Sequence, residues 1–177
     1  EDNDPAQTLQ FSAATYSVSE ALATATVTVT RSGGTAGGVT VDYAVGSGTA
    51  GAGSDFTAVT GTLSFAAGVL SKTFTVPILP DTLDEPEETV NLTLSNPTGG
   101  AALGGSAAAM LTITDNDVGG VLKFSAASYS VIEAIATATV TVTRTGGTAT
   151  GVTVHYAMRD GTATAGSEYS ATPGISA

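Results

Sequence analysis

The sequence predicts an all-β protein made of tandem antiparallel β-sandwich repeats, and three observations support this fold class. Apolar and polar residues alternate at period two in several short runs. Ala, Val, Thr and Gly are abundant while aromatic residues make up only 6% of the chain, which suits strands better than helices. Residues 2–64 also match residues 115–177 without gaps, with roughly 40 identities, as tandem repeats do.

The internal repeat divides the chain into three parts. Asp2–Asp4 recurs as Asp115–Asp117, so residues 1–5 are interpreted as the tail of a preceding repeat. Residues 6–117 form a complete repeat, whose length is usual for one independently folding domain. Residues 118–177 match only the first half of that unit. They are interpreted as the truncated N-terminal half of the next repeat.

About seven strands are expected in the complete repeat, each bounded by Gly, Pro, Asn or Asp. The clearest run is Ala25–Thr30, which places valines on one face and threonines on the other, and its copy Ala138–Thr143 predicts a second half-buried strand. Seven short strands in a domain of this size favour an antiparallel sandwich. In chain order, the predicted strands are Tyr16–Glu20, Ala25–Thr30, Val39–Ala44, Gly61–Phe65, Ser71–Ile78, Thr89–Ser95 and Ala109–Thr114.

Chain direction predicts that the acidic segments meet at one end of the sandwich, if successive strands run antiparallel and each crosses it fully. The first strand ends at Glu20, and the third leads into the loop that holds Asp55. The fifth leads into the acidic loop, defined as Asp81–Glu88, and the seventh into Asp115–Asp117. Every acidic loop is therefore expected at the same pole.

Carboxylates gathered in this way predict a bound cation, because five of the eight residues in the acidic loop are Asp or Glu and would repel one another. Oxygen ligands in large number suit Ca²⁺, which takes six to eight of them. Zinc is disfavoured, since the chain has no Cys and a single His, and magnesium fits such a site poorly.

Several runs resemble Calx-beta repeats: YSVSE, VTVDY, GTAGAGSDF, LTITDND and the stretch PILPDTLDEPEETVNLTLSNP. The resemblance spans essentially the whole chain and implies immunoglobulin-like sandwiches that bind calcium at one end. It departs from the pattern of exchanger members of the family at Pro80, where they carry a further aspartate, and at Asn116. In the partial copy, Glu133 matches Glu20 and Glu168 matches Asp55, but the acidic loop is missing. The implied calcium ligands are Glu20, Asp55, Asp81, Glu85, Glu88, Asp115 and Asp117.

Composition disfavours several other functions. The net charge is −11, which repels nucleic acid and anionic membranes, and no apolar stretch is long enough for membrane insertion. No nucleophile, base and orienting group form a recognisable catalytic set: His155 replaces Asp42 of the complete repeat, which has no histidine. The protein is not expected to be an enzyme. Asp84 and Glu87 are interpreted as solvated surface charges.

The predicted function is that of a calcium-binding structural or adhesive repeat of a large extracellular or cell-surface protein. Calcium is expected to rigidify the junction between neighbouring repeats of the chain, which are its expected partners. The truncated repeat is also expected to expose strand edges that favour self-association. Alternatives are a glycan-binding or protein-binding adhesin module, a metal-free spacer and a regulatory calcium sensor.

Overall fold

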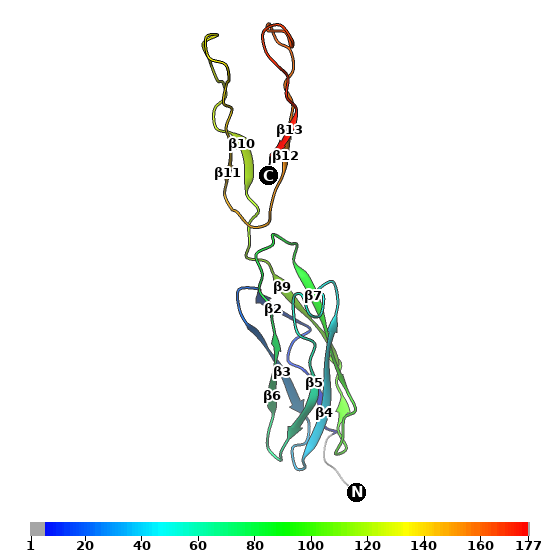
Figure 1. Ribbon diagram of the computed structural model, residues 1–177. Coiled ribbons are helices and arrows are strands. Elements are labelled where there is room, and N and C mark those ends of the chain that lie inside the picture. The colour runs from blue at the N-terminus through cyan, green and yellow to red at the C-terminus, as the bar shows by residue number, and fades with distance from the viewer. Residues whose placement is uncertain (1–5, 177) are drawn as a thin grey trace. The chain divides into compact units, whose positions relative to one another are not determined.

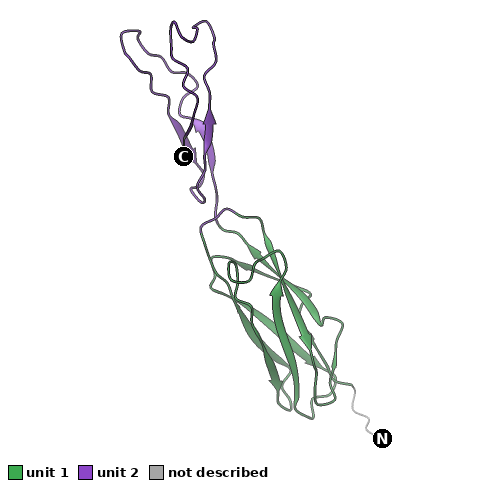
Figure 2. Ribbon diagram, turned by 45° about the vertical axis from the view of Figure 1, so that its right-hand side comes forward, with its two compact units in different colours: residues 1–81, 85–116 green, residues 82–84, 117–177 purple. Residues whose placement is uncertain are grey.

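The computed structural model describes residues 6–176, and every regular element in that range is a β-strand. Residues 1–5, interpreted from the sequence as the tail of a preceding repeat, lie outside the described residues. The described range has no helix long and apolar enough to cross a membrane. The chain forms two compact units, coloured separately in Figure 2. The first comprises the described residues up to Asp81 and Glu85–Asn116, and the second comprises Thr82–Asp84 and the described residues from Asp117 onward.

The first unit is the predicted β-sandwich, built from two sheets (Figure 1). One sheet has the strand order β6-β3-β1-β8 and the other β2-β9-β7-β4-β5. All neighbouring strands in them are antiparallel except the pairs β1–β8 and β2–β9, which are parallel. The strands are β1 (Thr8–Phe11), β2 (Thr15–Ser19), β3 (Thr24–Ser32), β4 (Val39–Ser47), β5 (Thr60–Phe65), β6 (Ser71–Pro77), β7 (Glu88–Ser95), β8 (Ala102–Leu103) and β9 (Ala108–Thr114).

Alternation along the strands places one side-chain face in the core between the sheets. In β3, Val27 and Val29 are fully buried while Thr26 is exposed. The rings of Tyr43 in one sheet and Phe74 in the other stack with centroids 4.0 Å apart. Burying this apolar surface stabilises the sandwich and fixes the strand ends that carry the acidic loops.

Each of the seven predicted runs overlaps an observed strand, but β1 and β8 were not predicted. β1 pairs with β3 in one sheet and β2 pairs with β9 in the other, so the chain changes sheets between Phe11 and Thr15. The residues in between, Ser12–Ala14, carry no Gly or Pro that would reveal this switch. β8 has only two residues, too few to show any alternation.

The second unit contains four short strands: β10 (Val121–Phe124), β11 (Val142–Thr145), β12 (Val154–Tyr156) and β13 (Gly174–Ser176). They form two antiparallel pairs, β10–β11 and β12–β13. The prediction of a half-buried strand over Ala138–Thr143 is wrong for most of this run, because β11 begins only at Val142. In the first unit, β3 pairs with β6 over the equivalent residues, and residues 118–177 contain no copy of β6.

Candidate metal centre

Glu20 and Asp115 lie side by side because they follow neighbouring parallel strands. Ser19, the last residue of β2, is in register with Thr114, the last residue of β9. The Glu20 amide donates a hydrogen bond to the Thr114 carbonyl at 2.9 Å, extending the ladder by one residue. The Glu20 side chain is buried, and a carboxylate oxygen of Glu20 lies within 4.8 Å of one of Asp115. Two acidic groups are thus fixed by sheet geometry.

The acidic loop is attached to these two carboxylates through its backbone. The Asp81 amide donates to Oε1 of Glu20 at 2.7 Å, and the Glu85 amide donates to Oδ2 of Asp115 at 3.0 Å. Each contact satisfies part of the hydrogen-bonding capacity of a carboxylate and leaves its other lone pairs available. The loop between β6 and β7 is therefore held against the ends of β2 and β9.

The loop between β4 and β5 presents Asp55 to the same place. Oδ2 of Asp55 accepts hydrogen bonds from the Gly51 amide at 2.6 Å and from the Ser54 hydroxyl at 2.9 Å, so the side chain is oriented by its own turn. The neighbouring Phe56 is fully buried and forms a β-bridge with Ile78, which joins this loop to the end of β6. The core thereby positions Asp55.

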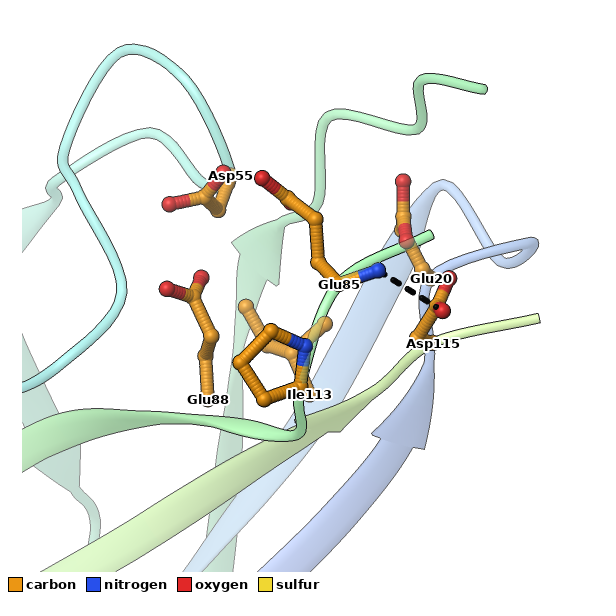
Figure 3. A pocket seen from close by; sticks show the side chains of 7 residues that line it. Glu20, Asp55, Glu85, Glu88, Ile113 and Asp115 are labelled. Carbon is orange, nitrogen blue, oxygen red and sulfur yellow. Dashed lines mark hydrogen bonds between the residues drawn. The ribbon is translucent and has the colours of Figure 1, made fainter. Parts of the chain in front are cut away.

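Asp55, Asp81 and Glu85 form a group in which one carboxylate oxygen of each residue lies within 4.8 Å of those of the other two. A narrow hollow lies beside this group (Figure 3). In that view Asp55 and Glu88 lie on one side of Glu85, and Glu20 and Asp115 lie on the other. The residues that line the hollow are Glu20, Asp55, Glu85, Pro86, Glu88, Ile113 and Asp115.

Burial and, after it, mutual repulsion raise the pKa of two of these groups. Burial raises the pKa of Glu85 above its ordinary value, with further contributions from the charges of Asp81, Asp55, Glu20 and Asp115. Burial, a hydrogen bond to Asp55 and nearby negative charges raise the pKa of Glu88 to about 7. The sequence has no Lys or Arg between Lys72 and Lys123 to offset these charges within the acidic loop or β9. The negative charge of the site therefore favours a bound cation, or a proton when no metal is bound.

The raised pKa of Glu88 predicts that the metal-free protein loses stability as the pH rises. Its value is 4.5 in an ordinary environment and about 7 in the fold, so the folded chain binds a proton over this interval that the unfolded chain has lost. The free energy of unfolding therefore falls with pH across this window. Urea denaturation in a chelator at pH 5 and pH 7.5 measures the change. Glu88→Gln should flatten the dependence, and a wild-type unfolding midpoint independent of pH would contradict the assignment.

Six of the seven residues implied as ligands gather at this end of the first unit: Glu20, Asp55, Asp81, Glu85, Glu88 and Asp115. Asp117 is the first residue of the second unit beyond the boundary at Asn116, and its role as a ligand stays a prediction. Asp84 is exposed and accepts a hydrogen bond from the Gly119 amide at 2.9 Å within the second unit. Ligation by the gathered residues likewise stays a prediction.

Sequence reasoning missed the groups that support the carboxylates. The amides of Gly51, Asp81 and Glu85 each donate to an acidic side chain. Backbone donors carry no residue-type signal, so no sequence pattern could reveal them. Ile113 and Pro86 line the hollow as apolar walls. The alternation of β9 could have indicated that Ile113 points inward, but not that it borders the site.

Sequence comparison places the chain in a known family. The Calx-beta domain matches residues 2–117 and again residues 115–175, and the chain belongs to this family. It is 33% identical over 185 residues to sodium/calcium exchanger 1 of Canis lupus familiaris, covering 94% of this chain and 19% of the exchanger. It is 31% identical over 169 residues to the sodium/calcium exchanger Calx of Drosophila melanogaster, covering 96% of this chain and 18% of that exchanger. The chain thus spans about a fifth of these relatives.

Solved structures agree with the fold. The crystal structure of the apo-form Calx CBD1 domain superimposes with a TM-score of 0.61 at 32% identity, covering 63% of this chain and 98% of that one. The crystal structure of CBD12 from CALX1.2 gives a TM-score of 0.63 at 30% identity, covering 95% of this chain and 69% of that one. The immunoglobulin-like sandwich expected from the sequence is confirmed. The resemblance of the sequence runs to Calx-beta repeats is confirmed as well.

Proposed function

We propose that the first unit is a calcium-binding structural module and that its acidic end holds Ca²⁺. The observation that carries this proposal is the convergence of six carboxylates from four separate segments: five line one narrow hollow, and a carboxylate oxygen of Asp81 lies within 4.8 Å of those of Asp55 and Glu85. The available ligands are all oxygens, and their number matches the six to eight that Ca²⁺ takes. The choice of ion is supported by a structural relative, CBD12 of CALX1.1, which is named as a calcium binding domain.

The residues divide into two roles in this proposal. Asp55, Asp81 and Glu85 offer oxygens close enough together for one ion, with Glu88 beside them. Glu20 and Asp115 hold the acidic loop through its amides and have lone pairs left for the same ion or a second one. A bound Ca²⁺ would displace the proton that Glu88, with its pKa raised to about 7, still holds in part at neutral pH. Calcium binding near pH 7 is therefore expected to release protons.

Calcium would stabilise the module by linking segments that come from distant parts of the chain. The acidic loop, the Asp55 loop and the ends of β2 and β9 meet only in the folded state, so the ion binds the native state in preference to the unfolded one. Asp115 is also the residue from which the chain runs toward the second unit. Calcium is proposed to restrain this segment and so to rigidify the junction between repeats.

Thermal unfolding tests this function. When free calcium is about ten times the dissociation constant, stability rises by about 1.4 kcal/mol, which corresponds to a Tm higher by several degrees. Differential scanning calorimetry with a chelator and then with millimolar calcium measures the shift. Asp42→Asn is the matched control, because Asp42 is bound by Thr62 and Asn96 on the sheet and is not part of the hollow. An unchanged Tm in wild type would favour a metal-free spacer.

A regulatory calcium sensor is the second candidate, and the identity of the relatives favours it. The curated proteins compared above are sodium/calcium exchangers, not the surface or secreted proteins that the sequence suggested. Affinity separates the two functions. Sensors bind calcium with dissociation constants of about 10⁻⁷–10⁻⁵ M, whereas extracellular modules bind at about 10⁻⁴–10⁻³ M. Pro80, where exchanger members carry a further aspartate, reduces the ligand count and favours the weaker range.

The extracellular location, the adhesive role and the absence of enzymatic activity belong to the structural-module proposal. The division into a complete repeat at 6–117 and a partial one at 118–177 is part of the same proposal. The internal repeat supports this division, since the family match also restarts at residue 115. Self-association through the partial repeat, and binding of a glycan or protein ligand, stay predictions from the sequence.

A further inference from the structure

Two threonines attach the loop that carries Asp55 to the start of β7. The Thr49 amide donates a hydrogen bond to Oγ1 of Thr89 at 3.1 Å, and the Thr89 amide donates to Oγ1 of Thr49 at 2.8 Å. The two hydroxyl oxygens are 3.3 Å apart. Each side chain therefore satisfies the backbone amide of the other residue. We call these two residues the Thr49–Thr89 pair.

The Thr49–Thr89 pair lies where the ladder between β4 and β7 ends. The last two residues in register are Ser47 and Val90. Beyond them, the Ala50 amide donates to the Thr89 carbonyl at 3.0 Å, and the Ala50 side chain is buried. A Cβ atom at Gly48 would lie only 2.5 Å from the Thr89 carbonyl oxygen. Glycine at position 48 is therefore what allows the loop to approach β7 this closely.

Each residue of the pair is adjacent to a proposed calcium ligand. Glu88 directly precedes Thr89 in the chain. Asp55 closes the turn that begins just after Thr49, and its carboxylate accepts a hydrogen bond from the Gly51 amide in that turn. Asp55 and Glu88 also share a hydrogen bond. The Thr49–Thr89 pair thus joins the backbone segments that carry these two carboxylates.

The other contacts of the Asp55 loop hold it to the opposite sheet. Phe56 forms its bridge with Ile78, and the Leu79 amide donates to the Asp55 carbonyl at 2.9 Å. Both partners follow β6, which belongs to one sheet, whereas Glu88 begins β7 in the other. Contacts to the end of β6 do not determine the distance from Asp55 to Glu88. The contacts with Thr89 do.

We propose that Thr49 and Thr89 are positioning residues that set the calcium affinity of the acidic end by holding Asp55 and Glu88 at the spacing that one ion requires. This inference rests on the proposed calcium function. Neither hydroxyl has to touch the ion, because the pair acts through the backbone on each side. Carboxylates that are already in place lose less conformational freedom when the ion binds. Groups that orient metal ligands typically change metal affinity by about 10–100-fold when they are removed.

The other end of β4 offers a matched control. The Thr40 amide donates to Oγ1 of Thr98 at 3.2 Å, and the two hydroxyl oxygens are 2.6 Å apart. Thr40 lies at the start of β4 and Thr98 lies beyond the end of β7, so this pair joins the same strands at their other ends. Neither residue lines the hollow. The loss of either threonine pair should have a similarly small effect on stability.

Isothermal titration calorimetry of the full chain with calcium tests the positioning role. Thr49→Val keeps the branched shape, removes the hydroxyl and should raise the dissociation constant about tenfold. Thr49→Ser restores the hydroxyl and should recover most of the affinity. Thr40→Val should leave the dissociation constant within about twofold of wild type. In chelator, Thr49→Val and Thr40→Val should lower the Tm alike.

Gly48→Ala tests the same geometry without removing a hydroxyl. The added Cβ must displace the loop from Thr89, so calcium affinity should fall at least as far as in Thr49→Val. Gly46→Ala is the matched control, because a Cβ at Gly46 meets no atom within 4 Å. Its dissociation constant should stay within about twofold of wild type.

The results separate failure of the positioning role from failure of the calcium function. If wild type binds calcium and Thr49→Val and Thr40→Val weaken binding equally, the positioning role is refuted and the calcium function stands. Unchanged affinity in both Thr49→Val and Gly48→Ala has the same meaning. If wild type does not bind calcium, the proposed function fails and the positioning role fails with it.

Discussion

Replacing Glu85 and Glu88 with glutamine is expected to weaken calcium binding at least a hundredfold, equivalent to about 2.7 kcal/mol. The substitution removes two of the carboxylates that line the hollow and leaves the size of the side chains nearly unchanged. In the metal-free protein the same change should not destabilise the fold at neutral pH, because both groups have a raised pKa caused by burial and by neighbouring negative charge. Loss of calcium affinity without loss of metal-free stability is the signature of a charge-dense ion site.

Glu87→Gln provides the control for this variant. Glu87 lies in the same acidic loop but is exposed and does not line the hollow. It changes the net charge without removing a proposed ligand, so its effect on calcium affinity should stay within about twofold, as for a screened surface charge. Isothermal titration calorimetry of the two variants and wild type measures the difference. Equal losses in both would mean that overall charge, not ligation, attracts the ion.

Phe56→Ala is expected to cost about 3–5 kcal/mol of stability, a large fraction of what a small domain has. Phe56 is fully buried and its bridge to Ile78 joins the Asp55 loop to the end of β6. Loss of the ring leaves a cavity at the base of the site, so calcium affinity should fall as well. The stability of the fold and the affinity for calcium are thus coupled through the Phe56 side chain.

Urea denaturation in chelator measures the stability cost, with Leu70→Ala as the control. Leu70 is 57% exposed, so its truncation should change the free energy of unfolding by no more than about 0.5 kcal/mol. A loss below about 1 kcal/mol for Phe56→Ala would contradict the role assigned to the ring.

The fold of the first unit could be predicted because period-two alternation determines both strand positions and the buried face. Ala25–Thr30 illustrates this: its valines are buried and Thr26 is exposed, as the pattern requires. The same pattern failed in Ala138–Thr143, where the sequence is identical but most of the run is not a strand. A strand needs a partner as well as a pattern, and the partner β6 is encoded far away in sequence.

The outline of the candidate site could be predicted from the same pattern, because the pattern also gives the direction of each strand. Strand direction alone brings Glu20, Asp55 and Asp115 to one end of the sandwich, and this follows from the number of strands between them. The raised pKa of Glu88 could not be predicted, because it depends on the distance to Asp55 and on burial. The attachment of the acidic loop through the amides of Asp81 and Glu85 could not be predicted either.

A calcium titration followed by amide NMR tests the central claim most directly. The amides of Gly51, Asp81 and Glu85 donate to the carboxylates of Asp55, Glu20 and Asp115, so they report on ligation at three places in the site. Calcium ligation predicts that these three resonances shift together and saturate with one dissociation constant, while the Thr26 amide on the sheet stays unchanged. If the three resonances do not move at calcium concentrations up to about 10 mM, well above the range of extracellular modules, the acidic end does not bind calcium.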